Sequence, residues 1–432
     1  MTAGLSGCFL NDPNDAESGL GGNAFATGGT QDGDGKVQIM GTFGGPEQKA
    51  LLASLEDFEK ESGIEIDYVS EKDLPTVIKQ KAKAGDTPDI ALFPQPGGLL
   101  ELADEGHIQP IDTYLDYDAL EKSLVPGFLE AARLNGRVYG APMKMAVKSL
   151  VFYPKKAYEK AGYDTAPKSL EEMRQIAGEM KADGTAPWCM GWNDAQNTGW
   201  VGTDWIEEFV LREAGPDVYD EWVDHDIAFD DPQIIKAFEA FKKTVLADGQ
   251  TYGGTKTILN TNFGESITPE FSSPPKCFWH RQGDFILSFL PKKIGANVDE
   301  EVGVFVLPPS ESGFKGQPIL GGGDTAALFN GNDKEAIEVM KFLTSDEFGG
   351  PWAKAGGWLS PHQSFDAEQY SSEMTKQIAE IVAQVDVFRF DASDLMPKAV
   401  GSDSFWDGMV AFAKGESAAK VTKRIDESWP EE

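Results

Sequence analysis

The sequence predicts an α/β fold, and three observations carry this prediction. Between residues 36 and 104, short apolar runs alternate three times with segments whose apolar residues recur at helical spacing. Such alternation is typical of a parallel sheet with helices on its faces. The 432 residues correspond to two or three domains at roughly 150 residues each. No apolar run reaches the roughly 18 uncharged residues of a membrane span, so the sequence predicts no transmembrane helix.

The first strand is expected at 36–42, and a helix follows it. Pro46 suits the first turn of that helix and Gly63 suits its end. The next elements are a strand at 64–69, a helix at 74–84, a strand at 89–93 and a helix from Leu99. Ligands of open α/β sheets bind at the carboxyl ends of the strands. We therefore expect the loops at 42–45 and 94–98 to approach a ligand.

In the middle of the chain, strands are expected at 138–142 and 149–153, and the charged residues between them indicate a crossing between two lobes. Ser169 and Glu172 form a capping-box pattern that starts a helix running to about residue 182. The later elements expected are a strand at 188–192, a helix from Asp231, a strand at 302–307 and helices at 332–343, 373–384, 404–414 and 417–427. The C-terminal part is therefore mostly helical.

The charge balance restricts the possible ligands. The chain has 38 basic and 71 acidic residues, a formal net charge of −33. Nucleic acid is not an expected partner, because neutralising phosphates requires a basic face. Anionic substrates are disfavoured by the long-range field. A neutral ligand fits this composition best.

Motifs of catalysis are missing from the sequence. None of the four histidines has zinc-type spacing, and there is no Gly-x-Ser-x-Gly elbow. Gly321-Gly322-Gly323 lacks the Lys-Ser/Thr of a phosphate loop. We therefore expect a protein that is not an enzyme and has no catalytic residue, metal or cofactor. With 71 carboxylates, a glycosidase-type acid pair stays open as an alternative.

The N-terminal segment has the features of a tethered extracellular protein. Leu5-Ser6-Gly7-Cys8 is similar to a bacterial lipobox, in which the cysteine becomes lipid-modified. The residues from 9 to 36 are rich in Gly, Asp and Asn and have no helical or strand periodicity. A flexible segment of this length reaches on the order of 30 Å. The alternative is an ordinary disordered N-terminus.

The three cysteines have a natural assignment. So few exclude a disulfide-dense scaffold and a multi-thiolate metal site. We expect Cys8 to carry the lipid and Cys189 to pair with Cys277, a disulfide worth roughly 4–5 kcal/mol in the chain-entropy model. Such a bond is chemically sensible outside the cytoplasm. Two buried free thiols are the alternative.

Aromatic and polar residues gather in five short segments. These are 192–200, 279–283, 321–324, 356–360 and 405–406. A sugar has an apolar ring face and a rim of hydroxyl groups, so its site needs a flat aromatic side chain and Asp, Asn, Gln or Arg. The segments therefore indicate a sugar site. As alternatives, Trp192 or Trp200 fills the core, and Asp324 caps a helix.

With these segments in place, the chain resembles the family 1 extracellular solute-binding proteins of carbohydrate ABC importers, which include the maltose-binding proteins. The resemblance covers about residues 36 to 429. It rests on Pro88-Asp89-Ile90, Gly140-Ala141-Pro142, Ser149-Leu150-Val151-Phe152-Tyr153, Phe314-Lys315-Gly316-Gln317-Pro318 and Ser404-Phe405-Trp406. Residues 187–191, 203–207 and 277–282 resemble the α-glucoside-binding branch of that family.

The resemblance implies a two-lobed periplasmic-binding-protein fold. Each lobe would have a central β-sheet flanked by helices, with the ligand cleft between the lobes. Residues 1–35 would hold the lipobox and tether. Residues 36–145 with about 310–355 would form the first lobe, and 146–309 with about 356–432 the second. The chain would cross between lobes near 143–149, 304–324 and 345–360.

The resemblance and the polar–aromatic segments together give a set of expected ligand-binding residues. They are Phe43, Gln95, Lys144, Asn197, Trp200, His280, Gly322, Gly323, Asp324, Trp358 and Trp406. Trp406 falls at the family's stacking aromatic position. Maltose binders usually place a Trp and charged residues in the loop where this chain has Pro94-Gln95-Pro96-Gly97-Gly98. The expected ligand is therefore a short neutral α-glucoside, such as maltose or trehalose.

The resemblance also implies the partners and the location of the protein. The ligand would be an α-linked disaccharide or similar neutral oligosaccharide, passed to the ABC permease subunits in the membrane. The protein would be a monomer, lipid-anchored at the extracellular face of the cell membrane. Two alternatives stay open: an extracellular glycan-active enzyme with related lobes, and a binder of peptides or polyols.

Overall fold

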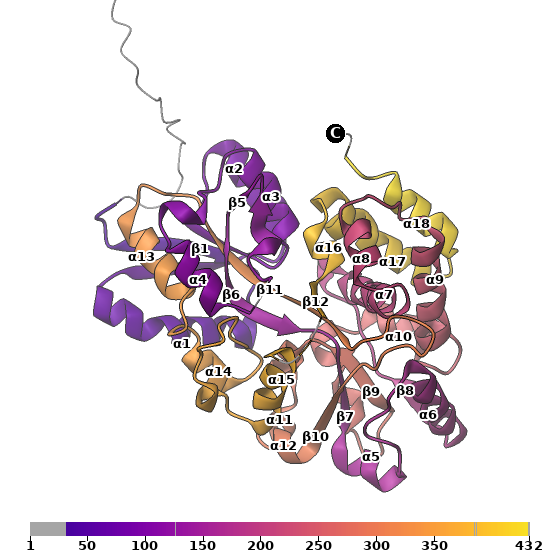
Figure 1. Cartoon of the computed structure of the whole chain (residues 1–432). Helices are drawn as coiled ribbons and strands as arrows, with labels where there is room; N and C mark the ends of the chain where they lie inside the picture. Colours follow the sequence, from indigo (N-terminus) through magenta and orange to yellow (C-terminus); the bar gives the residue numbers. More distant parts are fainter. Residues whose placement is uncertain (1–31, 126, 384, 386, 431–432) are drawn as a thin grey trace, which may run out of the picture.

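The computed structural model describes residues 32–125, 127–383, 385 and 387–430. The lipobox cysteine Cys8 and most of the expected tether lie outside these residues. Two β-sheets organise the described chain, and helices cover both of them (Figure 1). We call the six-stranded sheet with its helices the first lobe, and the four-stranded sheet with its helices the second lobe. The predicted two-lobed α/β fold is confirmed.

The first sheet has the strand order β12-β11-β3-β1-β2, with β6 also paired to β11. Its strands are β1 (Lys36–Gly41), β2 (Glu65–Ser70), β3 (Ile90–Phe93), β6 (Ala141–Val147), β11 (Pro318–Leu328) and β12 (Val387–Phe390). Strands β1, β2 and β3 run parallel to one another, as the alternating sequence pattern predicts. Strand β11 is antiparallel to both β3 and β6.

The second sheet has the order β10-β7-β9-β8. Its strands are β7 (Leu150–Pro154), β8 (Ala186–Trp188), β9 (Cys277–Gln282) and β10 (Val302–Val306). A separate hairpin consists of β4 (Arg133–Leu134) and β5 (Arg137–Val138). Only Lys148 and Ser149 separate β6 of the first sheet from β7 of the second, so the expected crossing near 143–149 is there. Residues 144–147 are part of strand β6, however, and not an irregular link.

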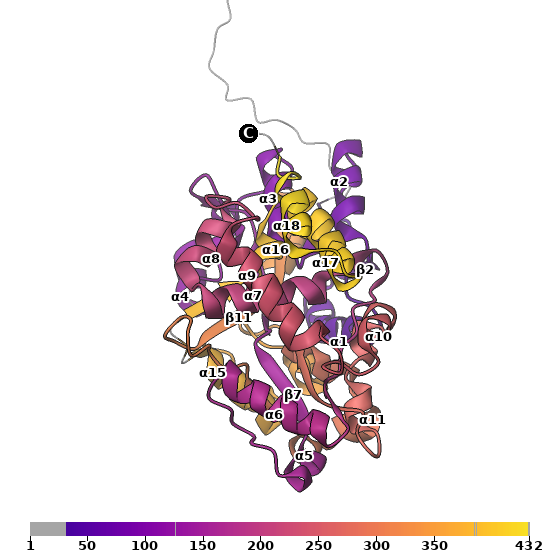
Figure 2. The same ribbon diagram turned by 90° about the vertical axis from the view of Figure 1, so that its right-hand side faces the viewer.

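The helices pack on the two sheets as Figures 1 and 2 show. They are α1 (Gly45–Ser62), α2 (Leu74–Ala84), α3 (Pro96–Asp104), α4 (Tyr117–Ser123), α5 (Lys155–Ala161), α6 (Leu170–Ala182), α7 (Trp200–Glu213), α8 (Pro216–Val223), α9 (Pro232–Phe241), α10 (Gly254–Asn260), α11 (Lys292–Gly295), α12 (Val298–Glu301), α13 (Lys334–Leu343), α14 (Gly350–Ala355), α15 (Glu373–Ala383), α16 (Ala392–Leu395), α17 (Trp406–Ala413) and α18 (Ala418–Asp426). Two π-helical segments, η4 (Lys242–Leu246) and η9 (Ala399–Phe405), adjoin α9 and α17.

Local signals set the ends of several helices. Gly63 follows α1 at φ 77°, a left-handed conformation that suits glycine. The Ser169 hydroxyl caps α6 by accepting a hydrogen bond from the Glu172 amide at 3.1 Å. The Glu172 carboxylate in turn accepts from the amide of Lys168 at 2.6 Å, one residue before the position of an ideal capping box.

The expected lobe boundaries stay a prediction, and one strand pairing bears on them. Strand β12 follows the boundary expected at about residue 356, yet it runs parallel to β11 in the first sheet. After β12, α16 packs against α3 of the first lobe and against α7 and α8 of the second. The helices that follow, α17 and α18, pack against α7 and α9, so the chain passes from the first lobe to the second after β12.

The predicted disulfide is confirmed. Cys189 follows β8 and Cys277 begins β9, and their Cα atoms lie 5.4 Å apart. Strands β8 and β9 pair in parallel, with Ala186 opposite Cys277. The bond closes a segment of 88 residues, which includes α7 to α10. It therefore restricts the unfolded chain over much of the second lobe.

Replacing both Cys189 and Cys277 by Ser should lower the free energy of unfolding by about 2–5 kcal/mol, because the unfolded chain regains loop entropy. Urea unfolding without reductant measures the difference. Reductant should bring the wild-type protein to the stability of the double variant and leave the variant unchanged. Equal stability of the two proteins without reductant would contradict the expected effect.

Candidate functional site

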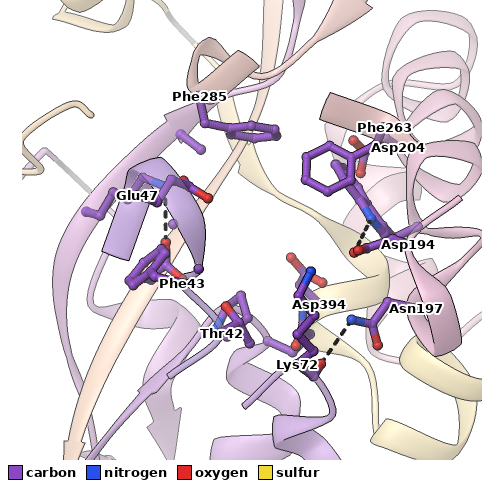
Figure 3. A pocket seen from close by; sticks show the side chains of 18 of the residues that line it. Thr42, Phe43, Glu47, Lys72, Asp194, Asn197, Asp204, Phe263, Phe285 and Asp394 are labelled. Atoms are coloured by element: carbon purple, nitrogen blue, oxygen red, sulfur yellow. Dashed lines mark hydrogen bonds and ion pairs between the residues drawn. The ribbon is translucent and has the colours of Figure 1, made fainter. Parts of the chain in front are cut away.

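A cavity of about 370 Å³ lies between the two lobes. Its size is within the range of roughly 300–1,000 Å³ that small-molecule sites occupy. Figure 3 shows Thr42, Phe43 and Glu47 on one side of the cavity, with Asp194, Asn197 and Phe263 on the other. Both lobes therefore contribute side chains to its wall.

The first lobe contributes loops at the carboxyl ends of parallel strands. Phe43 follows β1 and leads into α1, whose first turn carries Glu47. Gln95 follows β3 and precedes α3. These are the two loops that the sequence predicts to approach a ligand, and both line the cavity.

Lys144 and Asp324 face each other on the paired strands β6 and β11. The Lys144 ammonium lies 3.3 Å from the Glu47 carboxylate and 3.6 Å from that of Asp324. It also lies 5.0 Å from the centre of the Phe43 ring, within reach of a cation–π interaction. The register of the two strands shifts between Asp324 and Thr325, at a bulge.

Gly323 permits this close strand approach. A Cβ atom at Gly323 would lie 2.2 Å from the carbonyl oxygen of Lys144, so no larger residue fits without backbone movement. The glycine therefore has a packing role beside the two charged side chains. Because it lines the cavity, it also leaves the backbone open to a ligand.

Burial sets the protonation of this charged group. Burial raises the pKa of Asp324 to about 6, although the Lys144 ammonium acts in the opposite direction. Burial alone would lower the pKa of Lys144, but the charges of Glu47 and Asp324 outweigh it and raise that pKa above its ordinary value. Lys144 is therefore a cation that its neighbours already neutralise.

The second lobe contributes the segment from Asp194 to Trp200. The Trp200 indole N–H donates to Asp194 Oδ2 at 3.3 Å, and burial raises the pKa of the Asp194 carboxyl. The Asn197 side-chain amide donates to the backbone oxygen of Lys72 at 3.1 Å, which links the two lobes across the cavity (Figure 3). Asn197 is therefore a direct contact between the lobes at the edge of the cavity.

Lys148 forms a second charged group where the chain leaves β6. Its ammonium lies 3.2 Å from Asp204 and forms an ion pair with Asp391. Burial alone would lower the pKa of Lys148, but the charges of Asp204 and Asp391 outweigh it and hold the pKa well above its ordinary value. Burial also raises the pKa of nearby Asp394, a cavity residue, to about 7.

Three buried carboxylates in this group, of Asp204, Glu207 and Asp391, lie close enough together to share a metal ion. Two of the three already contact the Lys148 ammonium. A cation of the protein itself therefore occupies the place beside these oxygens. This arrangement supports no metal assignment.

Aromatic side chains complete the cavity wall. They are Phe43, Trp200, Phe263, Phe285, Phe289 and Trp406. Trp406 is only 5% exposed and begins α17. A Cβ atom at Gly199, where φ is 130°, would lie 2.4 Å from the Trp406 carbonyl oxygen. The glycine therefore lets the chain before Trp200 pass close to Trp406.

Eight of the predicted ligand-binding residues line the cavity, and their binding role stays a prediction. They are Phe43, Gln95, Lys144, Asn197, Trp200, Gly323, Asp324 and Trp406. The structure brings them together from segments between residues 43 and 406. Asn197, Trp200, Gly323, Asp324 and Trp406 lie in the polar–aromatic segments, and Phe43 and Gln95 lie in the loops expected at the carboxyl ends of strands. These positions were therefore within reach of sequence reasoning.

Three predicted residues lie outside the cavity wall. His280 is buried in β9, where its ring bonds the Cys189 carbonyl oxygen at 3.1 Å. Trp358 is buried in the first-lobe core, with its ring 6.0 Å from that of Phe348 and 5.2 Å from that of Phe365. Gly322 lies in β11, and a Cβ atom there would lie 3.3 Å from Asp391 Oδ2 and 3.6 Å from Lys148 Cε.

Sequence reasoning missed several residues of the wall. They include Glu47, Lys72, Lys148, Asp194, Asp204, Asn262, Phe263, Phe285, Phe289, Ser393 and Asp394. Asp194 fell inside a segment that the sequence had singled out, so its signal was present. Asp204 and Lys148 also fell in segments that had been noted, at 203–207 and at the crossing between the lobes, but without a role in binding. The others stand in ordinary helices and turns, and only the tertiary structure brings them together.

Taken together, the cavity offers aromatic faces, carboxylates, amides and paired ammonium groups. Carboxylates and amides accept or donate hydrogen bonds to hydroxyl groups, and aromatic faces cover apolar surface. This arrangement suits a small polyhydroxylated molecule with an apolar ring face.

Comparison with known proteins gives consistent relationships. Residues 44–349 match the family described as bacterial extracellular solute-binding protein. The chain is 38% identical over 395 residues to the osmoprotective compounds-binding protein GgtB of Synechocystis sp., covering 91% of this chain and 92% of the relative. It is 34% identical over 400 residues to the alpha-glucosides-binding periplasmic protein AglE of Rhizobium meliloti, covering 91% and 86%.

Solved structures share the fold at lower identity. Maltose-bound MalE3 of T. maritima is similar with a TM-score of 0.69 and 20% identity, covering 91% of this chain and 98% of that one. A chitin oligosaccharide binding protein is similar with a TM-score of 0.76 and 19% identity, covering 91% and 98%.

The raised pKa of Asp324 predicts a pH dependence of stability. Below about pH 3 this carboxyl is protonated in both the folded and the unfolded chain. As pH rises through about 6, the folded protein keeps the proton longer than the unfolded chain, so stability relative to Asp324→Asn falls. Urea unfolding should show wild type losing about 2–3 kcal/mol relative to the variant between pH 4 and pH 7.

Asp230→Asn, at an exposed position, controls for the loss of a surface carboxylate. A wild-type minus Asp324→Asn difference that stays constant with pH, or grows as pH rises, would contradict this assignment.

Proposed function

Since the chain belongs to the bacterial extracellular solute-binding protein family and is the solute-binding component of an ABC sugar importer, we propose that its interlobe cavity binds a short neutral α-glucoside of the maltose or trehalose type. The chain is not an enzyme. It acts outside the cytoplasm and works with the membrane components of the importer. Within the described residues, no helix is long and apolar enough to cross a membrane.

The observation that carries the proposal is the combination of paired charges and aromatic rings around a cavity of about 370 Å³. The Lys144 ammonium is neutralised by Glu47 and Asp324, and the Lys148 ammonium by Asp204 and Asp391. An anionic ligand would have to compete with these carboxylates for the lysines. A neutral hydroxyl group can instead bond to a carboxylate without disturbing the ion pair.

The rings and the lobe contact support a short ligand. Trp406, Trp200 and Phe263 come from one side of the cavity and can cover the apolar face of a pyranose. The Asn197–Lys72 hydrogen bond joins the lobes at the cavity edge and limits the room for a long chain of sugars. The relative named for alpha-glucosides, at 34% identity over 91% of this chain, supports the same ligand class.

The proposal includes the location and delivery of the ligand. Cys8, in the lipobox-like Leu5-Ser6-Gly7-Cys8, would carry a lipid, and the polar segment after it would tether a monomer to the extracellular face of the membrane. The lobes would present the bound sugar to the ABC permease. The eight cavity residues named above would make its contacts.

A thermal-shift screen tests the ligand. A molecule that binds only the folded protein raises its melting temperature by mass action. Maltose or trehalose should raise it, and glucose and maltotriose should raise it less. Thin-layer chromatography of the sugar afterwards should show no breakdown. A shift only with polyols or peptides, or none across the panel, would refute the α-glucoside assignment and leave the family assignment intact.

Replacing Trp406 by Ala should weaken binding of the disaccharide more than about tenfold, because the ring face loses its aromatic partner. Isothermal titration calorimetry measures the change. Trp429→Ala is the matched control, since Trp429 stacks on His225 away from the cavity wall. It should leave the affinity within about twofold. Equal affinity of Trp406→Ala and wild type would exclude stacking at this position.

A further inference from the structure

A second cavity lies inside the second lobe, and we propose that it binds a ring-sized molecule that carries a hydroxyl group. Its volume is about 150 Å³. Helices α6 and α7, the π-helix η4 and strands β8 and β9 supply its wall. Figure 2 shows α6 on the face of the second lobe turned to the viewer, below α7. Its lining residues do not overlap with those of the interlobe cavity.

Volume defines the size of the ligand. An apolar engineered cavity of about 150 Å³ in another protein stays dry and accommodates benzene. The cavity of this chain is therefore large enough for one six-membered ring. Apolar side chains, among them Leu170, Phe209 and Leu307, cover much of its wall and are at most 3% exposed.

Unpaired polar atoms define the chemistry of the ligand. The indole nitrogens of Trp188 and Trp205, the hydroxyl of Thr244 and the side-chain oxygen of Gln250 are buried, and none has a hydrogen-bond partner among the described residues. All four residues line this one cavity. Trp188 and Trp205 are 2% and 0% exposed. Buried polar atoms are normally hydrogen-bonded, so four in one cavity wall indicate a polar occupant.

Trp279, in the same wall, does have a partner for its indole nitrogen. The Trp279 indole N–H donates to the Tyr158 hydroxyl at 3.1 Å. Other indole nitrogens are also buried without a partner among the described residues, those of Trp192, Trp222, Trp352, Trp358 and Trp406. The feature that distinguishes this wall is the presence of Thr244 and Gln250 beside its two unpaired indoles. A single hydroxyl group can accept from an indole N–H and donate to the Gln250 oxygen. A phenol or a cyclic alcohol has this hydroxyl on a ring of the right size.

Backbone geometry adds an independent observation. Thr244 is part of η4, where the chain after α9 takes a π-helical turn. Such turns occur mostly as single insertions and are frequent at functional sites. This one places Lys243 and Thr244 in the cavity wall, with Lys243 exposed at its solvent side. The opening would therefore lie between η4 and α6.

The binding test uses the full chain and ¹⁹F NMR of 4-fluorophenol. The wild-type protein should bind it with a Kd below about 1 mM, an affinity within reach of a ligand of this size. Fluorobenzene, which lacks the hydroxyl group, should bind at least about fivefold more weakly. No binding of 4-fluorophenol, or equal binding of fluorobenzene, would overturn the proposal.

Two substitutions on α6 locate the site. Ala177→Leu fills the cavity and should weaken binding at least about tenfold. Gly178→Leu is the matched control, because Gly178 is exposed and a Cβ atom there meets nothing within 4 Å. It should leave the affinity within about twofold. If Ala177→Leu and Gly178→Leu bind equally well, the probe is elsewhere and the proposal fails.

Thr244→Val gives a second test that does not depend on filling the cavity. It removes the hydroxyl at nearly constant volume and should weaken 4-fluorophenol about threefold or more. Melting temperature and disaccharide affinity are measured for each variant. They should stay close to wild type, so a failure of this site is distinguishable from a failure of the interlobe site. Unchanged 4-fluorophenol affinity in Thr244→Val would count against the predicted hydroxyl contact and overturn the proposed chemistry.

Discussion

The structure depends on a row of buried charges on helix α7. Charges inside a protein require partners, because removing them from water costs several kcal/mol for each ion. On α7 some of the partners come from the connections between the lobes. Asp204 binds Lys148 between β6 and β7. Arg212 donates to the carbonyl oxygens of Leu307 and Pro318, at the two ends of the link from β10 to β11.

The third connection meets the same helix. After β12, the amide of Ser393 donates to Glu207 at 2.9 Å, and Asp391 pairs with Lys148. One helix of the second lobe therefore contacts each of these three connections. A lobe movement that separated these ion pairs would leave charges buried without partners, a loss of roughly 3–5 kcal/mol for each broken pair. Movement of the lobes is therefore expected to bend the short connecting segments and to preserve the contacts on α7.

The sequence predicted those parts of the fold that have local causes. Helix α2 has the predicted bounds, α1 begins and ends beside Pro46 and Gly63, and α6 begins after the predicted cap Ser169 and ends at residue 182 as expected. Strand β11 was missed because its three glycines lower the strand propensity of the segment. Its pairing with β3, β6 and β12 comes from elements far away in the sequence. Such pairings have no local signal.

The same division applies to the site. Composition pointed to Asp324 and Trp406, because aromatic, glycine and acidic residues stand side by side there. Lys148 and Asp394 gave no such signal, since their importance comes from partners on other segments. His280 stands in a segment of the right composition but does not line the interlobe cavity. Strand β9 is buried on both sides, so burial alone did not indicate which side faces the cavity. Residue type could be predicted, but the side of a buried strand on which a residue lies could not.

Helix α7 also separates the two cavities. Trp200 and Asp204 line the interlobe cavity, whereas Trp205 and Phe209 line the cavity inside the second lobe. Within each pair the two residues are four positions apart, so they lie on one face of the helix. The two pairs lie on different faces, because Trp205 directly follows Asp204 in the sequence. The guanidinium of Arg281 joins them, since it lies 5.4 Å from the Trp205 ring and 3.3 Å from Asp204. A displacement of α7 at either cavity would therefore also move the wall of the other cavity, because Arg281 contacts both. It would also disturb the connections between the lobes, because their ion pairs are made with α7.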